Sequence, residues 1–226
     1  MEAMPKISVI GIGYRRFDRT TADIMKRADH ILASARLFEV FKGYEEFPAV
    51  ADRVVVIPRM DETIEFIRAN KETKNIVLLA SGDPLFFGIG KRIIDEFGRE
   101  RVDIYPDLSS VQAAFARIKE PWDNVFFMSL HGGPDPEQRR RLEFDLADIP
   151  SLLTRHPKIA ILTDREKNPS LIATAIAGHE PPGSGLRARI FVCERLGYPD
   201  EQVTEGTPEE IRKMTFSDPN VVIVMR

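Results

Sequence analysis

Short apolar runs that are rich in β-branched residues recur along this chain, and each has the length of one β-strand. The runs lie at residues 7–12, 54–57, 76–80, 102–105, 125–129, 159–162, 188–193 and 221–225. Segments of helix length separate most of them, with apolar residues three positions apart, as at Ala22, Met25 and Ala28. Alternation of strands with helices is typical of α/β proteins, so we expect sheets of mainly parallel strands.

The size of the chain allows more than one core. It has 226 residues, of which 43% are hydrophobic and 30% charged, which is enough for one large or two small globular domains. Helical periodicity ends after residue 118, at Lys119-Glu120-Pro121-Trp122-Asp123, near the middle of the chain. The sequence therefore predicts two α/β domains, at residues 1–118 and 119–226.

The charge and the rarer residues argue against several classes of function. A formal net charge of −3 disfavours a nucleic-acid-binding surface, which usually carries a basic excess. Cys193 is the only cysteine, so neither an intramolecular disulfide nor a cysteine metal cluster can form, and the four histidines show no ligand spacing, so no metal is expected. The first apolar run ends at Ile12, too short for a signal peptide or a membrane span, so we expect a cytoplasmic protein without membrane contact.

The segment Ser81-Gly82-Asp83-Pro84 follows the apolar run at 76–80, and loops that follow strands are where α/β proteins bind ligands. Gly82 can adopt a positive φ and allows a ligand to approach the backbone. Asp83 supplies a hydrogen-bond acceptor at the strand end, and Pro84 is expected to begin the next helix. A Gly-Asp-Pro sequence is also an ordinary turn, so both interpretations stay open.

Two further loops follow strands. Tyr105-Pro106-Asp107-Leu108-Ser109-Ser110 carries two consecutive hydroxyl groups that suit the N-cap of a helix whose apolar stripe begins at Val111. Such a cap can also bind a ligand. The segment Ser129-Leu130-His131-Gly132-Gly133 ends a later strand, and its histidine is either an exposed loop residue or a residue that faces a cleft.

Two glycine-containing segments approach nucleotide-binding motifs but lack a required residue. Gly11-Ile12-Gly13 follows the first strand, yet the dinucleotide-binding fingerprint needs a third glycine where this chain has Arg16. Gly90-Lys91 lacks the earlier glycine of a P-loop, because that position is Leu85, and Arg92 stands where Ser or Thr would hold magnesium. A nicotinamide cofactor and a nucleoside triphosphate are therefore disfavoured.

Basic residues follow two of the strand ends. Arg15 and Arg16 come directly after the Gly-Ile-Gly turn, and Arg165 and Lys167 follow the run at 159–162. These positions suit a substrate that carries carboxylates, because the guanidinium fork pairs well with carboxylate oxygens. The three arginines at 139–141 are better explained as the solvated face of a helix. The alternative is that they form an anion-binding rim.

Five segments, taken in order, resemble those of the tetrapyrrole methylase family. They are Ile7-Ser8-Val9-Ile10-Gly11-Ile12-Gly13, the Ser-Gly-Asp-Pro loop, the paired serines, Ser129-Leu130-His131-Gly132 and Glu194-Arg195-Leu196-Gly197. The resemblance covers nearly the whole chain and is strongest to the branch that methylates C5 of a corrin precursor in cobalamin biosynthesis. The chain departs from the family at Asp107, where members usually carry a glycine after the proline, which implies a different local turn.

The resemblance implies two α/β domains, with S-adenosylmethionine bound in the cleft between them and a reduced tetrapyrrole across its opening. The residues implied to line the cofactor are Tyr14, Gly82, Asp83, Phe86, Ser110, Val111, Leu130, His131 and Thr163. Arg15, Arg16, Arg165 and Lys167 would then meet the carboxylates of the substrate. The implied reaction transfers a methyl group from the cofactor to ring carbon C5 and leaves S-adenosylhomocysteine; it requires no dedicated general base, and no catalytic residue is assigned.

Alternatives to this activity remain. The chain could methylate another position of a tetrapyrrole, or a modified histidine as diphthine synthases do, although Trp122 and the segment at 129–133 favour the corrin branch. A third possibility is a scaffold that binds a tetrapyrrole or a nucleotide without turnover.

We also expect a homodimer, from the resemblance and from apolar runs at 37–41 and 126–128. A separate protein is expected for the neighbouring C15 methylation and decarboxylation, because the chain ends about where the resemblance ends.

Overall fold

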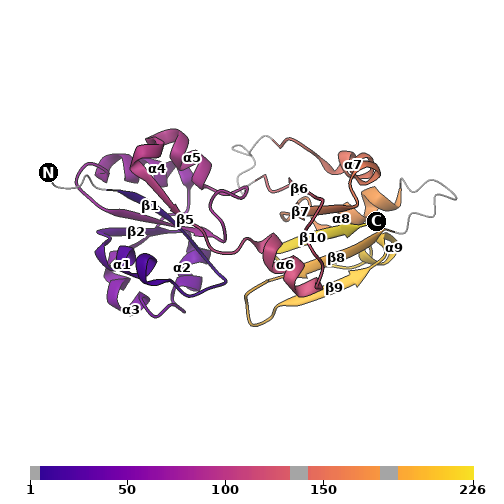
Figure 1. Ribbon diagram of the computed structural model, residues 1–226, viewed down its shortest axis with the longest axis horizontal. Coiled ribbons are helices and arrows are strands. Elements are labelled where there is room, and N and C mark those ends of the chain that lie inside the picture. The colour runs from indigo at the N-terminus through magenta and orange to yellow at the C-terminus, as the bar shows by residue number, and fades with distance from the viewer. Residues whose placement is uncertain (1–5, 133–141, 179–187) are drawn as a thin grey trace. The chain divides into compact units, whose positions relative to one another are not determined.

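The computed structural model describes residues 6–132, 142–178 and 188–226. The chain divides into two compact units, Met1–Ser109 and Ser110–Arg226, and each holds one five-stranded sheet (Figure 1). The sequence places the boundary after residue 118, whereas the structure groups the helix Ser110–Ile118 with the second unit. The loss of helical periodicity after residue 118 marks the end of this helix.

The sheet of the first unit is parallel throughout, in the order β3-β2-β4-β1-β5. Its strands are β1 (Ile7–Ile12), β2 (His30–Ala33), β3 (Val54–Val56), β4 (Ile76–Ser81) and β5 (Val102–Tyr105). All six residues of β1 are buried, because β4 and β5 flank it and both faces of the sheet are covered. This is why β1 reads as an almost continuous apolar run.

Helices cover both faces of the first sheet (Figure 1). On one face lie α1 (Arg19–Arg27), α2 (Ala35–Phe41) and α3 (Phe47–Val50), and on the other lie α4 (Met60–Asn70) and α5 (Gly90–Phe97). Two short 3-10 helices, η1 (Ala51–Arg53) and η2 (Arg99–Arg101), precede β3 and β5. Alternate residues of β1 divide between the two cores, so that Ile10 and Ile12 pack toward α1 and α2 while Ile7 and Val9 pack toward α4 and α5.

The sheet of the second unit is mixed, in the order β6-β7-β10-β8-β9. Its strands are β6 (Val125–Ser129), β7 (Lys158–Leu162), β8 (Arg189–Glu194), β9 (Gln202–Gly206) and β10 (Asn220–Met225). Among these described strands only the β6–β7 pair is parallel; the other three pairs are antiparallel. The prediction of mainly parallel strands is therefore right for the first sheet and wrong for the second, where the loop 195–201 is too short for a parallel crossover.

One face of the second sheet carries the larger core of this unit. Against it pack α7 (Ile149–Arg155), α8 (Pro169–Ala177) and α9 (Pro208–Ile211), with the 3-10 helix η4 (Leu146–Asp148) beside them. Val222 and Val224 of β10 belong to this core. The alternate β10 residues Val221 and Ile223 are also buried, and α6 (Ser110–Ile118) contacts β10, which places α6 on the opposite face.

All eight apolar runs are strands in the structure, but two strands were not predicted from the sequence pattern. β2 has only four residues, and β9 is an edge strand of largely polar, exposed residues without an apolar run. The apolar runs at 37–41 and 126–128 belong to α2 and β6 and contribute Leu37, Phe41 and Met128 to the cores of their own units. These runs therefore give no support to the predicted homodimer.

None of the helices in the described part of the chain combines the length and the apolar character that a membrane span requires.

Candidate active site

The ends of three neighbouring strands meet closely in the first unit. β1 lies between β4 and β5, and all three run in parallel, so their carboxyl ends lie at one edge of the sheet. A Cβ at Gly11 would lie 1.8 Å from the carbonyl oxygen of Gly82, and a Cβ at Gly82 would lie 2.7 Å from the carbonyl oxygen of Leu108. Gly82 has φ +60, as predicted. Only glycine permits this approach of the loops.

The connections that leave β1 and β4 diverge. β1 leads to α1 on one face of the sheet, whereas β4 leads to α5 on the other. In open α/β sheets, ligands bind outside the carboxyl ends of adjacent strands whose connections leave toward opposite faces. The loops after β1 and β4 therefore form the strongest candidate site of this unit.

Asp83 begins a turn in the loop after β4. Its Oδ1 accepts a hydrogen bond from the backbone nitrogen of Leu85 over 2.8 Å, which supports the interpretation as a turn residue without excluding a ligand. Helix α5 starts only at Gly90, so the prediction that Pro84 begins it is wrong. Instead, the carbonyl oxygen of Pro84 accepts from the nitrogen of Gly90 over 2.8 Å, and the intervening loop holds Phe86.

Side chains from elsewhere in the first unit hold the loop after β1. The hydroxyl of Tyr44 accepts from the nitrogen of Gly13 over 2.9 Å. Oδ2 of Asp107 accepts from the nitrogens of Tyr14 at 2.7 Å and Arg15 at 3.1 Å. Burial raises the pKa of the Tyr44 phenol above its ordinary value. In the sequence, Asp107 stood out only because the family usually carries a glycine after the proline. Nothing in the sequence indicated that Tyr44 would hold this loop.

The predicted residues of the second unit differ in exposure. Leu130 is fully buried in the core and Val111 is nearly so, which leaves only their backbones to meet a ligand. His131 is exposed, and Ser110 is the first residue of α6. The hydroxyl of Thr163 lies 2.5 Å from Oδ1 and 2.9 Å from the carbonyl oxygen of Asn220, so its single proton is engaged within the protein.

Asp164 links two loops in the second unit. Its Oδ2 accepts from the nitrogen of Gly132 over 3.0 Å, and its Oδ1 accepts from the nitrogens of Glu166 at 2.9 Å and Lys167 at 2.8 Å. Gly132 follows β6 and Asp164 follows β7, and these strands are parallel neighbours. The carboxyl ends of this pair are therefore tied together as those of the first unit are.

Each of the four predicted substrate-binding cations pairs with a carboxylate of its own unit. The pairs are Arg15 with Asp107 at 2.8 Å, Arg16 with Glu45, Arg165 with Asp218 at 3.2 Å and Lys167 with Asp145 at 2.7 Å. These carboxylates reduce the positive charge that the sequence predicts at the strand ends. The arginines at 139–141 and His179 lie outside the described residues.

Comparison with known proteins identifies the family. A model of the tetrapyrrole (corrin/porphyrin) methylases matches residues 6–212. The chain belongs to this family. The predicted family, the two-domain α/β fold and the methyltransferase class are therefore confirmed.

Individual members of the tetrapyrrole methylase family match most of the chain. It is 30% identical to a cobalt-precorrin-7 C(5)-methyltransferase of Salmonella typhimurium over 87% of this chain and 88% of that protein. It is 28% identical to a decarboxylating precorrin-6Y C(5,15)-methyltransferase of Mycobacterium tuberculosis, over 89% of this chain but only 46% of that protein.

Solved structures of tetrapyrrole methylases share the fold. The crystal structure of the precorrin-6Y methylase from Archaeoglobus fulgidus aligns with a TM-score of 0.69 at 24% identity, over 99% of this chain and 98% of that one. A uroporphyrin-III C-methyltransferase from Thermus thermophilus, complexed with S-adenyl homocysteine, aligns with a TM-score of 0.65 at 19% identity, over 97% of this chain and 92% of that one.

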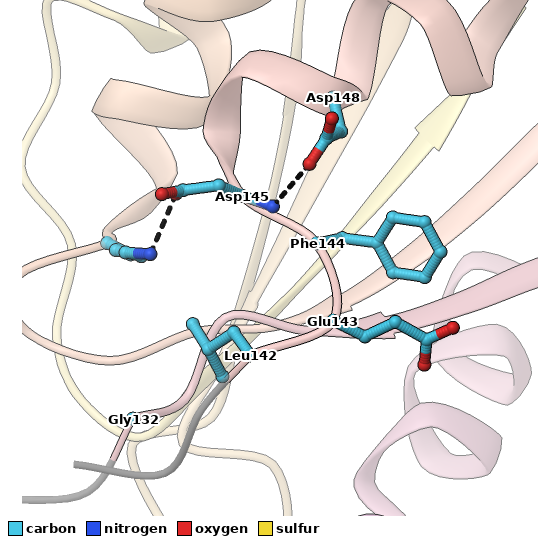
Figure 2. A pocket seen from close by; sticks show the side chains of 7 residues that line it. Gly132, Leu142, Glu143, Phe144, Asp145 and Asp148 are labelled. Atoms are coloured by element: carbon cyan, nitrogen blue, oxygen red, sulfur yellow. Dashed lines mark hydrogen bonds and ion pairs between the residues drawn. The ribbon is translucent and has the colours of Figure 1, made fainter.

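A pocket of about 330 Å³ opens in the second unit of this tetrapyrrole methylase (Figure 2). It is lined by Gly132, Leu142, Glu143, Phe144, Asp145, Asp148 and Lys167. The lining holds three carboxylates and a single lysine, and that lysine already pairs with Asp145. The charge of the lining disfavours a polycarboxylate ligand.

Among the described residues, no cluster of His, Cys, Asp and Glu is arranged to hold a metal ion.

Proposed function

We propose that this tetrapyrrole methylase transfers a methyl group from S-adenosylmethionine to C5 of a corrin precursor, of the cobalt-precorrin-7 or precorrin-6Y type, in cobalamin biosynthesis. The observation that carries the proposal is the 30% identity, over 87% of the chain, to a relative named as a cobalt-precorrin-7 C(5)-methyltransferase. A second relative whose name also specifies C5 supports the same ring position.

The residues of the first unit suit the cofactor. The ammonium group of the cofactor needs acceptors, and Asp83 places a half-buried carboxylate at the end of β4. Gly11 and Gly82 let the backbones of the loops after β1, β4 and β5 pack against one another, which fixes the loop that carries Asp83. A structural neighbour is complexed with S-adenyl homocysteine, the product form of the cofactor, which supports this cofactor.

The chain's main contribution to the reaction is alignment. The bound cofactor supplies a methyl group on a positively charged sulfur, which is intrinsically ready for displacement by an electron-rich ring carbon. The residues around the site then have to orient the two reactants and exclude water. Arg15, Arg16, Arg165 and Lys167 are the residues we assign to the substrate carboxylates, each in competition with its carboxylate partner.

Thermal scans and product analysis test the proposal. A scan with S-adenosylmethionine or S-adenosylhomocysteine at 100 times its dissociation constant should show a stabilisation of about 2.7 kcal/mol. Incubation of the chain with labelled cofactor and a panel of corrin precursors should give a product whose fragmentation places the new methyl group at C5. No thermal shift would contradict the cofactor, and methylation at another ring position would contradict the proposed substrate.

Three further properties remain predictions. We infer that the chain acts as a homodimer in the cytoplasm, from the family resemblance, and sedimentation at micromolar concentration should give twice the mass of 25.6 kDa. We also infer, from the family resemblance, that a C15 methyltransferase and decarboxylase acts on the same precursor. The name of the Mycobacterium tuberculosis relative includes both a C15 methylation and a decarboxylation, and this chain matches 46% of its length.

A further inference from the structure

The carboxylate of Asp107 is the most heavily used acceptor at the strand ends of the first unit. Its side chain is 4% exposed. Oδ2 accepts from the backbone nitrogens of Tyr14 and Arg15, and Oδ1 accepts from Nε of Arg15 over 2.8 Å and from the nitrogen of Leu108 over 2.7 Å. Every one of these contacts is a donated N–H, so the site requires a group that only accepts.

The loop that Asp107 holds would otherwise expose a row of donors. Gly13, Tyr14 and Arg15 are consecutive, and the nitrogen of Gly13 donates to Tyr44 while the next two donate to Asp107. Successive N–H groups of this kind form an anion-binding concavity. Here the anion is a side chain of the protein, which closes the concavity and orders the loop.

Asp107 also connects the loop after β1 to the loop after β4. Its backbone nitrogen donates to the carbonyl oxygen of Gly82 over 3.2 Å, while its side chain holds Tyr14 and Arg15. The guanidinium of Arg15 is fixed twice, because Nη2 also donates to the carbonyl oxygen of Pro106 over 3.2 Å. The side chain of Arg15 remains 56% exposed, so its outer face is open to a substrate.

We propose that Asp107 is a positioning residue for methyl transfer: its carboxylate fixes the Tyr14–Arg15 loop and the orientation of the Arg15 guanidinium that meets the substrate. The inference rests on the proposed function, since Arg15 is assigned to the substrate there and the family resemblance implies that Tyr14 lines the cofactor. It goes beyond that function in giving a role to a residue that the proposed function assigns to neither the cofactor nor the substrate.

The test compares Asp107→Asn and Asp107→Ala with Asp103→Asn. Asp103 lies on β5, the strand that precedes Asp107, is 42% exposed on its side chain and pairs with Lys6, so its variant makes the same change of charge away from the loop. The amide in Asp107→Asn keeps the shape of the carboxylate but places an NH₂ group against backbone donors. We expect kcat/KM for the precorrin substrate to fall at least tenfold in both Asp107 variants and to stay within twofold in the control.

Chemical rescue separates positioning from mere stability. Formate has the carboxylate that Asp107→Ala lacks, so it should restore at least part of kcat/KM in this variant, whereas chloride at equal ionic strength should not. Backbone hydrogen exchange at Tyr14 and Arg15 should be faster in Asp107→Asn than in the wild type and the control.

Several outcomes would overturn the inference. Wild-type kcat/KM in Asp107→Asn would do so, as would a loss in Asp107→Ala that formate does not restore while the folded fraction is unchanged. If Asp107→Ala does not fold, the exchange rates and kcat/KM of the isosteric Asp107→Asn decide. An inactive wild-type protein would instead contradict the proposed function, so the two failures are distinguishable.

Discussion

The hydroxyl oxygen of Tyr44 lies 2.9 Å from the backbone nitrogen of Gly13, and this hydrogen bond joins the segment after α2 to the loop after β1. The ring of Tyr44 packs on Phe17 and Phe41, with centroids 4.6 and 5.9 Å away. Tyr44→Phe should keep this packing and remove the hydrogen bond. We expect a loss of about 1 kcal/mol in the free energy of unfolding at neutral pH, measured by urea denaturation.

The same tyrosine predicts a dependence on alkaline pH. Burial, as the largest cause, raises the pKa of Tyr44 above the ordinary value of 10.0, so the folded state favours the neutral phenol. The stability that this contributes is complete below about pH 10 and is lost as the pH rises through the raised pKa. The difference in unfolding free energy between the wild type and Tyr44→Phe should therefore shrink above about pH 10. A constant difference up to about pH 11 would contradict burial of the phenol.

Gly11→Ala should prevent the close approach of the loops after β1 and β4. The new Cβ would lie 1.8 Å from the carbonyl oxygen of Gly82 and 2.6 Å from the nitrogen of Asp107, and both are backbone atoms that cannot swing away. We expect a destabilisation of at least about 3 kcal/mol, at the upper end for overpacking. Gly43→Ala is the control, since its Cβ would meet only Val40 at 3.4 Å and should cost less than about 1 kcal/mol.

The first sheet shows which parts of this protein a sequence pattern can predict. β1 and β4 are long apolar runs because both faces of the sheet are covered, so the pattern found them and the site loops that follow. The antiparallel pairs of the second sheet were not predictable from the same runs, because a strand's apolar character does not reveal the direction of its neighbour. β9 lacked a signal because an edge strand needs no apolar face.

The residues that hold the site were harder to predict than the loops themselves. The positive φ of Gly82 is a property of the turn in which it lies, so the Ser-Gly-Asp-Pro motif alone indicated it. Tyr44 and Asp107 act on a loop that lies 31 and 93 residues away from them in the sequence, and only the fold brings them together. The carboxylate partners of the four predicted cations were invisible for the same reason, which is why the sequence overstated the positive charge.

Two variants of Asp83 separate its turn from its charge. Asn retains the side-chain oxygen that accepts from Leu85 but removes the charge, whereas Ala removes both. If the carboxylate binds the ammonium of S-adenosylmethionine, Asp83→Asn should weaken cofactor binding by about 1 to 3 kcal/mol in calorimetry, with little change in stability. Affinity equal to that of the wild type in Asp83→Asn would leave Asp83 as a turn residue only.

Asp164→Asn should loosen the loops after β6 and β7. The carboxylate accepts from the nitrogens of Gly132, Glu166 and Lys167, and an amide in its place can accept on one oxygen only. When the amide oxygen keeps the nitrogens of Glu166 and Lys167, the NH₂ group faces the nitrogen of Gly132, so we expect faster hydrogen exchange at Gly132 and a loss of about 1 to 2 kcal/mol in stability. Asp123→Asn removes an exposed carboxylate of the same unit and should leave exchange at these amides unchanged.

The four predicted substrate-binding cations lead to a prediction of how the rate of methylation depends on salt concentration. A corrin precursor carries several carboxylates, so exposed arginines at the site should raise its rate of encounter, and salt screens this effect as the Debye length falls from about 30 Å at 0.01 M to about 10 Å at 0.1 M. Arg165 is the most exposed of the four predicted cations, at 91%, although it pairs with Asp218, so kcat/KM should fall only a few-fold across this range.

Charge reversal at Arg165 tests that steering directly. Arg165→Glu should lower kcat/KM at low salt and flatten its dependence on ionic strength, while cofactor affinity stays the same. Arg189→Glu is the matched control, because Arg189 is also exposed and pairs with Glu205. Arg189 is the first residue of β8. Strands β7 and β8 both run antiparallel to β10 and therefore parallel to each other, so Arg189 lies at the end of the sheet opposite the loop that follows β7.

The slope of kcat/KM against ionic strength in Arg189→Glu should equal that of the wild type. Equal slopes for Arg165→Glu and the wild type would place the substrate carboxylates elsewhere. If Arg165 attracts the substrate, reversing its charge changes the electrostatic field at the site, and the dependence of kcat/KM on salt must change with it.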